Sequence, residues 1–319
     1  MSAVEENTTI SFARPDWRER IMSGRSLLPD LPTDRPTTSE SAEIAVEVWG
    51  GLKVPDVEGS PLFSAVGVPW FKDFLHSMFL MDGPRRVARE AFVMVPKKSG
   101  LSTNCAALML TALIVNKRIG AEFAMLGATM EVAGDLFWLM SWMINADDNL
   151  AALFVVRKYR REIEHRLTGA KAIVRALDSD ALSGARLCGV VVDHVEFLRQ
   201  RRFADALREV RGSMIRYEDS FLILAGRQSI EPPAGVFLKE LERARATRDG
   251  KIDGGVLPLI YEPPEGVDWR DPANFPLLHP GFGYTVAAEM LAQVIAEADQ
   301  HGYAAEWAAQ WFNVQAVAQ

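Results

Sequence analysis

The chain has 319 residues, 49% of them hydrophobic and 24% charged, which is ordinary for a globular protein with one large core. The formal net charge of -7 argues against an autonomous DNA-binding domain, although Arg157 to Arg161 and Arg199 to Arg202 form short basic clusters that are also typical of solvated surface. Cys105 and Cys188 lie in apolar stretches without zinc-site spacing, and no signal peptide or membrane-length apolar run occurs, so we expect a cytoplasmic protein.

The first 60 residues are rich in serine, threonine, proline and acidic side chains. The stretch "PDLPTDRPTTSES" (Pro29 to Ser41) is typical of chain that buries little apolar surface. We therefore predict a flexible or loosely docked segment over residues 1–60 and a folded core over residues 61–262. The pattern changes near Trp70, where "PWFKDFLHSMFL" has helical periodicity.

The core alternates short apolar runs with helical patterns. Strands are predicted at residues 91–95, 121–129, 188–198, 220–229 and 256–262, and helices at residues 104–116, 130–144, 202–214 and 233–250. This order predicts an α/β protein with a mostly parallel sheet flanked by helices.

Two further segments complete the predicted organisation. Residues 151–178 carry β-branched and basic side chains and a turn signal at Thr168-Gly169, which predicts an inserted β-hairpin or meander followed by a helix. Residues 263–319 begin as a Pro-rich loop and continue as a helical C-terminal segment.

The loop at residues 96–103 lies between a predicted strand and a predicted helix, as the phosphate-binding loop of P-loop proteins does. That loop reads GxxxxGK[ST]: its backbone N–H groups hold phosphate, its lysine neutralises it and its hydroxyl binds Mg²⁺. Gly100 stands at the second glycine, and Ser102 or Thr103 at the hydroxyl, but Leu101 replaces the lysine. A basic turn that opens a helix is the alternative interpretation. The candidate nucleotide contacts are Lys97, Lys98, Ser99, Gly100, Leu101, Ser102 and Thr103.

Asp193 follows the apolar run Gly189 to Val192, the pattern of a strand-ending acid that holds Mg²⁺. A glutamate that activates water usually comes next. Here the next residue is His194, which accepts a proton when it is neutral, and Glu196 lies two positions further on. We take all three as catalytic candidates, with Ser102 and Asp193 as metal ligands; the alternative is that Asp193 only caps the next helix.

Residues 226–229 follow another buried strand. In P-loop motors a polar residue at this strand end senses the γ-phosphate, and Gln228 is the catalytic candidate, with Ser229 beside it. Arg227 is either a phosphate contact or a surface residue. Ligands of open parallel sheets bind at the carboxyl ends of the strands, so three such loops in order favour a nucleotide site.

From about Trp70 to Val314 the sequence resembles the large terminase subunits of tailed phages. The resemblance rests on "VPKKSGLST", "LSGARLCGVVVDHVEFL", "LPLIYEPPE", "DPANFPLLHPGFG" and, above all, the long run "QSIEPPAGVFLKELERARATRDGKIDGG". It implies a P-loop NTPase of the RecA/ASCE type that uses ATP and Mg²⁺ to package double-stranded DNA into procapsids. The implied partners are double-stranded DNA, a portal, a small terminase subunit and further copies of the chain, without a membrane.

The chain departs from the family pattern at each catalytic loop. The family's phosphate loop is close to PKKNSKTT or PRKNGKS, so Lys97 and Lys98 match its basic pair while Leu101 replaces the catalytic lysine. Asp193 matches the Walker B acid, but His194 replaces the expected glutamate. These departures fit either an impaired ATPase or a variant motor in which Lys97 or Lys98 takes over the lysine's role.

Other interpretations stay open. One is a catalytically inactive nucleotide-binding or scaffold protein, and another is an unrelated P-loop ATPase, against which "EPPAGVF" argues. The family's nuclease half carries clustered acids, and none follows Asn313, so we expect no nuclease domain and no DNA cleavage. Arg85 and Arg86 precede the first core strand and are either an arginine finger or a solvated turn.

Overall fold

A central sheet organises the protein. The computed structural model describes residues 11–30 and 36–316, and these form an eight-stranded sheet of order β10-β3-β9-β8-β4-β7-β6-β5. The parallel strands are β3 (Glu90–Met94), β4 (Glu122–Gly127), β7 (Lys171–Ala176), β8 (Leu187–Val192), β9 (Phe221–Gly226) and β10 (Leu257–Ile260). At one edge, β5 (Phe154–Arg157) and β6 (Glu162–His165) run antiparallel. The predicted α/β class with a mostly parallel sheet is confirmed.

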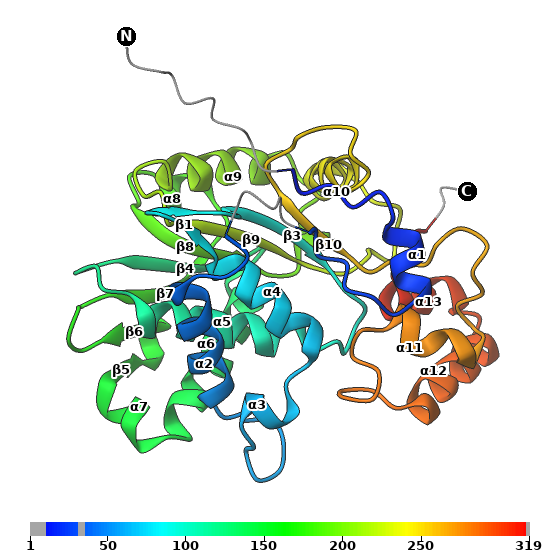
Figure 1. The fold of residues 1–319 in the computed structure, drawn as a ribbon, viewed down its shortest axis with the longest axis horizontal. Helices are drawn as coiled ribbons and strands as arrows, with labels where there is room; N and C mark the ends of the chain where they lie inside the picture. Colours follow the sequence, from blue (N-terminus) through cyan, green and yellow to red (C-terminus); the bar gives the residue numbers. More distant parts are fainter. Residues whose placement is uncertain (1–10, 31–35, 317–319) are drawn as a thin grey trace.

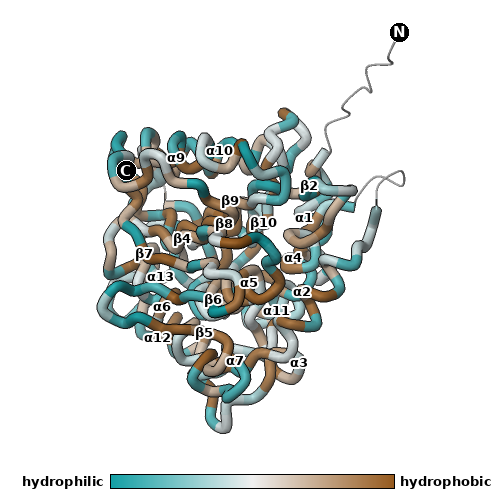
Figure 2. The backbone as a smooth tube through the Cα atoms, turned by 90° about the vertical axis from the view of Figure 1, so that its left-hand side faces the viewer, coloured by the Kyte–Doolittle hydropathy of each residue, from teal (hydrophilic) through white to brown (hydrophobic). Residues whose placement is uncertain are grey.

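Helices cover both faces of this sheet (Figure 1). One face carries α2 (Glu40–Gly51), α4 (Pro69–Phe79), α5 (Leu101–Val115) and α6 (Met130–Asn145); the other carries α8 (Ser179–Leu182), α9 (Arg202–Ser213) and α10 (Gly235–Arg248). Along β8, Val191 joins the first core, while Val190 and Val192 join the second. Because both faces are buried, the central strands are continuously apolar, as Figure 2 shows.

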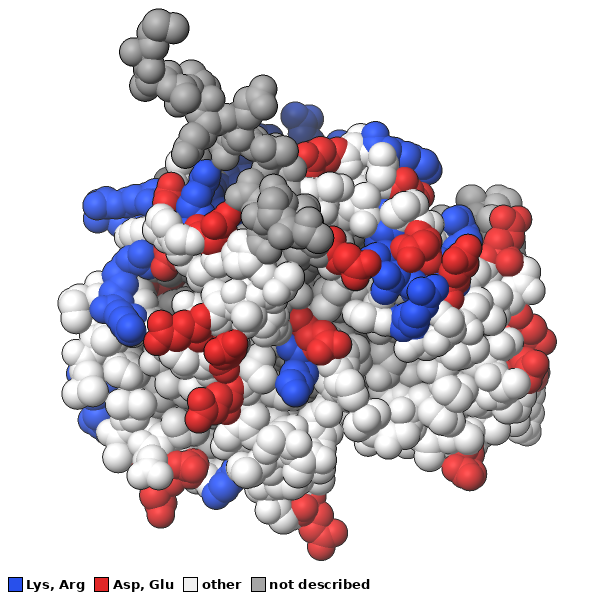
Figure 3. Space-filling view, in the orientation of Figure 1, with Lys and Arg blue, Asp and Glu red and all other residues white. Residues whose placement is uncertain are grey.

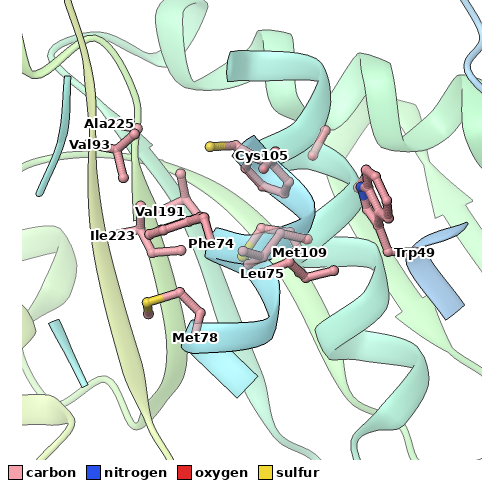
Figure 4. Close-up of a cluster of buried hydrophobic side chains, with 14 of the residues drawn as sticks. Trp49, Phe74, Leu75, Met78, Val93, Cys105, Met109, Val191, Ile223 and Ala225 are labelled. Atoms are coloured by element: carbon pink, nitrogen blue, oxygen red, sulfur yellow. The ribbon is translucent and has the colours of Figure 1, made fainter. Parts of the chain in front are cut away.

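Helix α5 lies between the sheet and the outer helices and is buried on nearly all sides. In Figure 4, its Cys105 and Met109 lie among Phe74 and Leu75 of α4 and Val191 of the sheet. Cys105 and Cys188 are both buried free thiols. The dense packing fixes α5 rigidly, and α5 begins where the predicted phosphate loop ends.

The N-terminal segment differs from the prediction. Residues 1–10 and 31–35 lie outside the described part, but the rest of residues 1–60 packs into the core through α1 (Trp17–Met22) and α2, and α3 (Phe63–Val66) follows them. Trp17, Ile21 and Trp49 are buried, and the Arg248 guanidinium lies 3.8 Å from the Trp17 ring centroid. The expectation of loose docking is wrong here because a few well-spaced aromatic residues anchor a segment whose average composition is polar.

The inserted segment also differs in part. A meander forms, as predicted, from β5, the short helix η1 (Lys158–Arg160), β6 and β7. However, the helix of this segment, α7 (Asp148–Leu153), precedes the meander instead of following it. The Asp147 side chain caps α7 by accepting hydrogen bonds from the backbone N–H groups of Asn149 and Leu150. Residues 171–176 instead form β7, which pairs in parallel with β4.

Beyond β10 the chain forms η3 (Pro272–Asn274), α11 (Phe275–Leu278), α12 (Ala288–His301) and α13 (Ala304–Phe312). These helices gather beside α1 in Figure 1. A two-stranded ribbon, β1 (Met81–Asp82) and β2 (Arg85–Arg86), precedes the main sheet. None of the helices in the described ranges combines the length and apolar character needed to cross a bilayer.

Candidate functional site

The predicted phosphate loop joins β3 to α5 and opens onto a cavity of about 600 Å³. Gly100, which precedes α5, has a φ of 77°, and a Cβ at this position would lie 3.1 Å from Asn104 Nδ2. Because glycine brings no side chain to the helix start, the first backbone N–H groups of α5 stay open to the cavity. This helix end favours a bound anion.

The cavity lies at the carboxyl ends of β3, β9 and β8, which are neighbours in the sheet. It is lined by Lys97 to Thr103 and by Asp193, His194 and Glu196, so the structure brings nearly all predicted site residues together. Of the other walls, the sequence indicated only the loop that follows β9. These walls are Val54, Asp56 and Val57 from the N-terminal segment, Phe63, Val66, Gly67 and Val68 from the chain that follows it, Gly226 and Arg227 from the end of β9, and Tyr284 and Thr285 from the C-terminal segment.

Ser102 and Asp193 meet at the wall of this cavity. Ser102 Oγ donates to Asp193 Oδ2 at 3.0 Å, and the other carboxylate oxygen accepts from the backbone N–H of His194 at 2.9 Å. Asp193 is 1% exposed, and burial raises the pKa of its carboxyl, although the neighbouring His194 and Ser102 oppose this rise.

The donor set at this point fits a magnesium ion that arrives with phosphate. Mg²⁺ is commonly bound by one carboxylate, a hydroxyl, phosphate oxygens and water. Ser102 and Asp193 supply the two protein oxygens. Within the described ranges, no group of three or more His, Cys, Asp or Glu residues could hold a metal ion.

His194 and Glu196 form a hydrogen-bonded pair after β8. His194 has a φ of 55°, and its Nδ1 lies 3.0 Å from Glu196 Oε1, while its ring stacks on Phe197 with 5.5 Å between centroids. Burial lowers the pKa of His194, but the bond to Glu196 and the charge of Asp193 outweigh it, so the pKa is raised. Both residues of the pair line the cavity beside Asp193.

Gln228 is placed differently from the prediction. Gln228 and Ser229 are buried and do not line the cavity. The Gln228 backbone N–H donates to Asn313 Oδ1 at 2.9 Å, and its side-chain oxygen accepts from the Ser229 backbone N–H at 3.0 Å. The chain turns inward after β9, so Gln228 meets the C-terminal segment, and Arg227 is the side chain of this loop that lines the cavity.

The C-terminal segment makes hydrogen bonds and an aromatic contact to the phosphate loop. The Lys97 backbone N–H donates to the Gln310 carbonyl at 2.7 Å, and Lys97 Nζ lies 5.6 Å from the Trp311 ring centroid. Thr285 Oγ1 donates to the Lys98 carbonyl. Lys98 has a φ of 69°, which a residue with a side chain adopts only when its surroundings hold it there. The segment predicted as a helical C-terminal linker therefore contacts the phosphate loop directly.

Comparison with proteins of known structure identifies the fold. A scan against models of protein families found no match, and a search of curated proteins found none. Among solved structures, the large terminase of bacteriophage HK97 matches with a TM-score of 0.72 and 16% sequence identity, over 86% of this chain and 55% of that chain. The fold is that of a phage large terminase.

Two further matches of this terminase fold are weaker. The large terminase of a thermophilic bacteriophage gives a TM-score of 0.42 and 10% identity over 75% of this chain and 50% of that chain. The same phage protein in complex with ATP-gamma-S gives a TM-score of 0.38 and 12% identity over 59% of this chain and 43% of that chain. Scores this low carry no argument of their own. The chain spans about half the length of the terminases it matches.

Proposed function

We propose that this chain is the ATPase part of a terminase-type DNA-packaging motor and that ATP binds with Mg²⁺ in the cavity of about 600 Å³. The hydrogen bond between Ser102 and Asp193 carries the proposal. It joins the hydroxyl that follows the phosphate loop to the acid that ends the adjacent parallel strand, which is the pairing that phosphoryl transfer in P-loop proteins requires. The terminase fold supports this assignment.

The phosphate loop would take the triphosphate. Backbone N–H groups from Gly100 to Thr103 offer donors at the start of α5, and Lys97 and Lys98 supply positive charge. Ser102 and Asp193 would hold Mg²⁺, which neutralises charge on the phosphates when it is bound. The apolar side chains of the N-terminal wall, such as Val54 and Phe63, suit the flat face of a nucleobase.

His194 and Glu196 would accept the proton of the attacking water. The histidine lines the cavity and hydrogen-bonds to a glutamate that is 3% exposed, so the proton can pass from the ring toward a buried carboxylate. This pair takes the place of the single glutamate that normally follows the magnesium-binding acid.

Double-stranded DNA, a portal, a small terminase subunit and further copies of this chain are the proposed partners, in the host cytoplasm. Charges of both signs are mixed on the face shown in Figure 3, in keeping with the net charge of -7. DNA binding is therefore expected to need the assembled ring, in which several copies present their basic side chains to the same duplex.

A second candidate function is nucleotide binding without turnover. Leu101 favours it, because a half-exposed leucine stands where the lysine that neutralises the phosphates is expected. Such a chain would act as a scaffold subunit that keeps the terminase fold.

Binding and turnover of MgATP by the purified protein test both candidates. Calorimetry measures affinity, and phosphate release measures turnover, alone and with DNA and partner subunits. Lys97→Ala and Lys98→Ala are expected to weaken ATP binding about tenfold each, whereas Lys72→Ala, at an exposed lysine of α4, is the matched control. Binding without turnover in every mixture would select the scaffold function, and absence of binding would reject both.

A further inference from the structure

The Arg227 side chain lies at the cavity and makes few contacts with other protein groups. Arg227 is 22% exposed in its side chain and lines the cavity. Among residues 11–30 and 36–316, its guanidinium forms one ion pair, from Nε to Glu196 Oε1 at 3.5 Å, and no hydrogen bond. An arginine fork can make several bonds to a planar or tetrahedral oxyanion, so most of this capacity is free.

The backbone fixes the position of Arg227. It follows β9, which lies in the sheet between β3, the strand of the phosphate loop, and β8, the strand of Asp193. The Val95 backbone N–H donates to the Gly226 carbonyl at 3.1 Å, and the Arg227 backbone N–H donates to Glu196 Oε2 at 3.4 Å. A Cβ at Gly226 would lie 2.4 Å from Glu196 Oε2, so glycine is needed for this close approach.

The phosphate loop lacks a lysine at position 101. Leu101 brings no charge, and Lys97 Nζ lies over the Trp311 ring. Burial lowers the pKa of Lys97, and the charges of Arg227 and Lys98 lower it further, so these three cations lie within electrostatic reach of one another.

We propose that Arg227 binds the terminal phosphate in place of the missing lysine at position 101 and exchanges Glu196 for phosphate when ATP enters. This deepens the proposed function and rests on it. The 3.5 Å pair with Glu196 holds the guanidinium at the wall of the cavity that the phosphate loop also lines. When Arg227 moves to phosphate, Glu196 keeps only His194 as its side-chain partner. Nucleotide binding would therefore free Glu196 from the arginine and leave it to act with His194 as the proton acceptor.

The test compares ligands that differ by one phosphate. Affinities for ADP and for a non-hydrolysable ATP analogue are measured by calorimetry with Mg²⁺. Arg227→Gln is expected to weaken binding of the ATP analogue at least about tenfold and of ADP less than about threefold, and Arg227→Lys to restore part of the loss. Arg199→Gln, at an exposed arginine that pairs with Glu231, is the matched control.

A double-mutant cycle tests the exchange. Glu196→Gln frees Arg227, so it is expected to strengthen binding of the ATP analogue several-fold, and this gain should shrink in the Arg227→Gln background. Equal losses for ADP and the ATP analogue, or no loss, would overturn the role of Arg227 while leaving the nucleotide site intact. No binding by the unaltered protein would reject the proposed function itself, and this inference with it.

Discussion

His279 Nε2 lies 3.0 Å from the carbonyl oxygen of Lys97, a contact between residues 182 positions apart in the sequence. The other ring nitrogen, Nδ1, accepts from the Gly281 backbone N–H at 3.2 Å. Both contacts are satisfied by a neutral ring with its proton on Nε2. His279 is fully buried, so this ring links the C-terminal segment directly to the phosphate loop.

Removal of this link is expected to loosen the phosphate loop. His279→Ala leaves the Lys97 carbonyl without its buried donor and should weaken ATP binding about tenfold and lower stability by about 2 kcal/mol. His279→Gln keeps a donor of similar reach and should recover most of the affinity. Calorimetry and urea denaturation measure the two effects. Equal ATP affinity for His279→Ala and the unaltered protein would show that the loop holds its shape without the C-terminal segment.

The same residue makes stability depend on pH. Burial lowers the pKa of His279 from 6.5 to about 4, so the unfolded state binds a proton more readily than the folded state. This contribution to stability is present above pH 6.5 and is lost as the pH falls toward 4, by up to about 3 kcal/mol. The difference in unfolding free energy between the unaltered protein and His279→Gln, followed from pH 7 to 4, measures it. A difference that stays constant over this range would contradict the assignment.

Asp193→Asn is expected to abolish the effect of Mg²⁺ on ATP binding and to increase stability. Because burial raises the pKa of the Asp193 carboxyl, its charged form opposes folding at neutral pH, and the neutral amide should raise the free energy of unfolding. The Ser102 hydroxyl can accept from the new amide. Mg²⁺ should no longer strengthen ATP binding in this variant, nor in Ser102→Ala. Magnesium-dependent ATP affinity that survives in both variants would place the metal elsewhere.

Arg86 is expected to act on stability and not as an arginine finger. Its Nε donates to the Asp219 carbonyl at 2.8 Å, its Nη1 donates to the Met78 carbonyl, and its guanidinium lies 4.9 and 5.1 Å from the Phe79 and Phe221 ring centroids. Arg86→Ala should therefore lower the free energy of unfolding by about 3 kcal/mol.

The control for Arg86 is Arg208→Ala, at an exposed pair with Asp205, which should change stability by less than about 0.5 kcal/mol. Urea denaturation compares the two variants. A stable Arg86→Ala protein that lost ATP turnover would instead restore the arginine-finger interpretation.

Much of the sheet could be predicted from the sequence, because each buried parallel strand is a short apolar run between helical patterns. The run that becomes β7 lies where the sequence predicts a helix after the hairpin, and only its pairing with β4 and β6 makes it a strand. Average composition does not predict the packing of the N-terminal segment, because it hides anchoring residues such as Trp17 and Trp49, which are buried.

The candidate site was predictable where it consists of local motifs. Asp193 and Ser102 were expected from strand-loop-helix order, and the structure places them 3.0 Å apart. Gln228 was expected at the cavity from its place after a strand, but the direction of a side chain after a strand end depends on the path of the next loop. For the same reason, the sequence does not decide whether Arg227 is a phosphate contact or a surface residue.

By itself, the sequence determined the succession of strands and helices and the loops that could meet phosphate, since hydrophobic periodicity and glycine placement are local properties of a chain. Only the tertiary structure decided that His279 and Thr285 hold the phosphate loop and that Arg227 faces Glu196. Such contacts join residues far apart in the chain, and they form only when packing brings buried donors and acceptors together and excludes the water that would otherwise satisfy them.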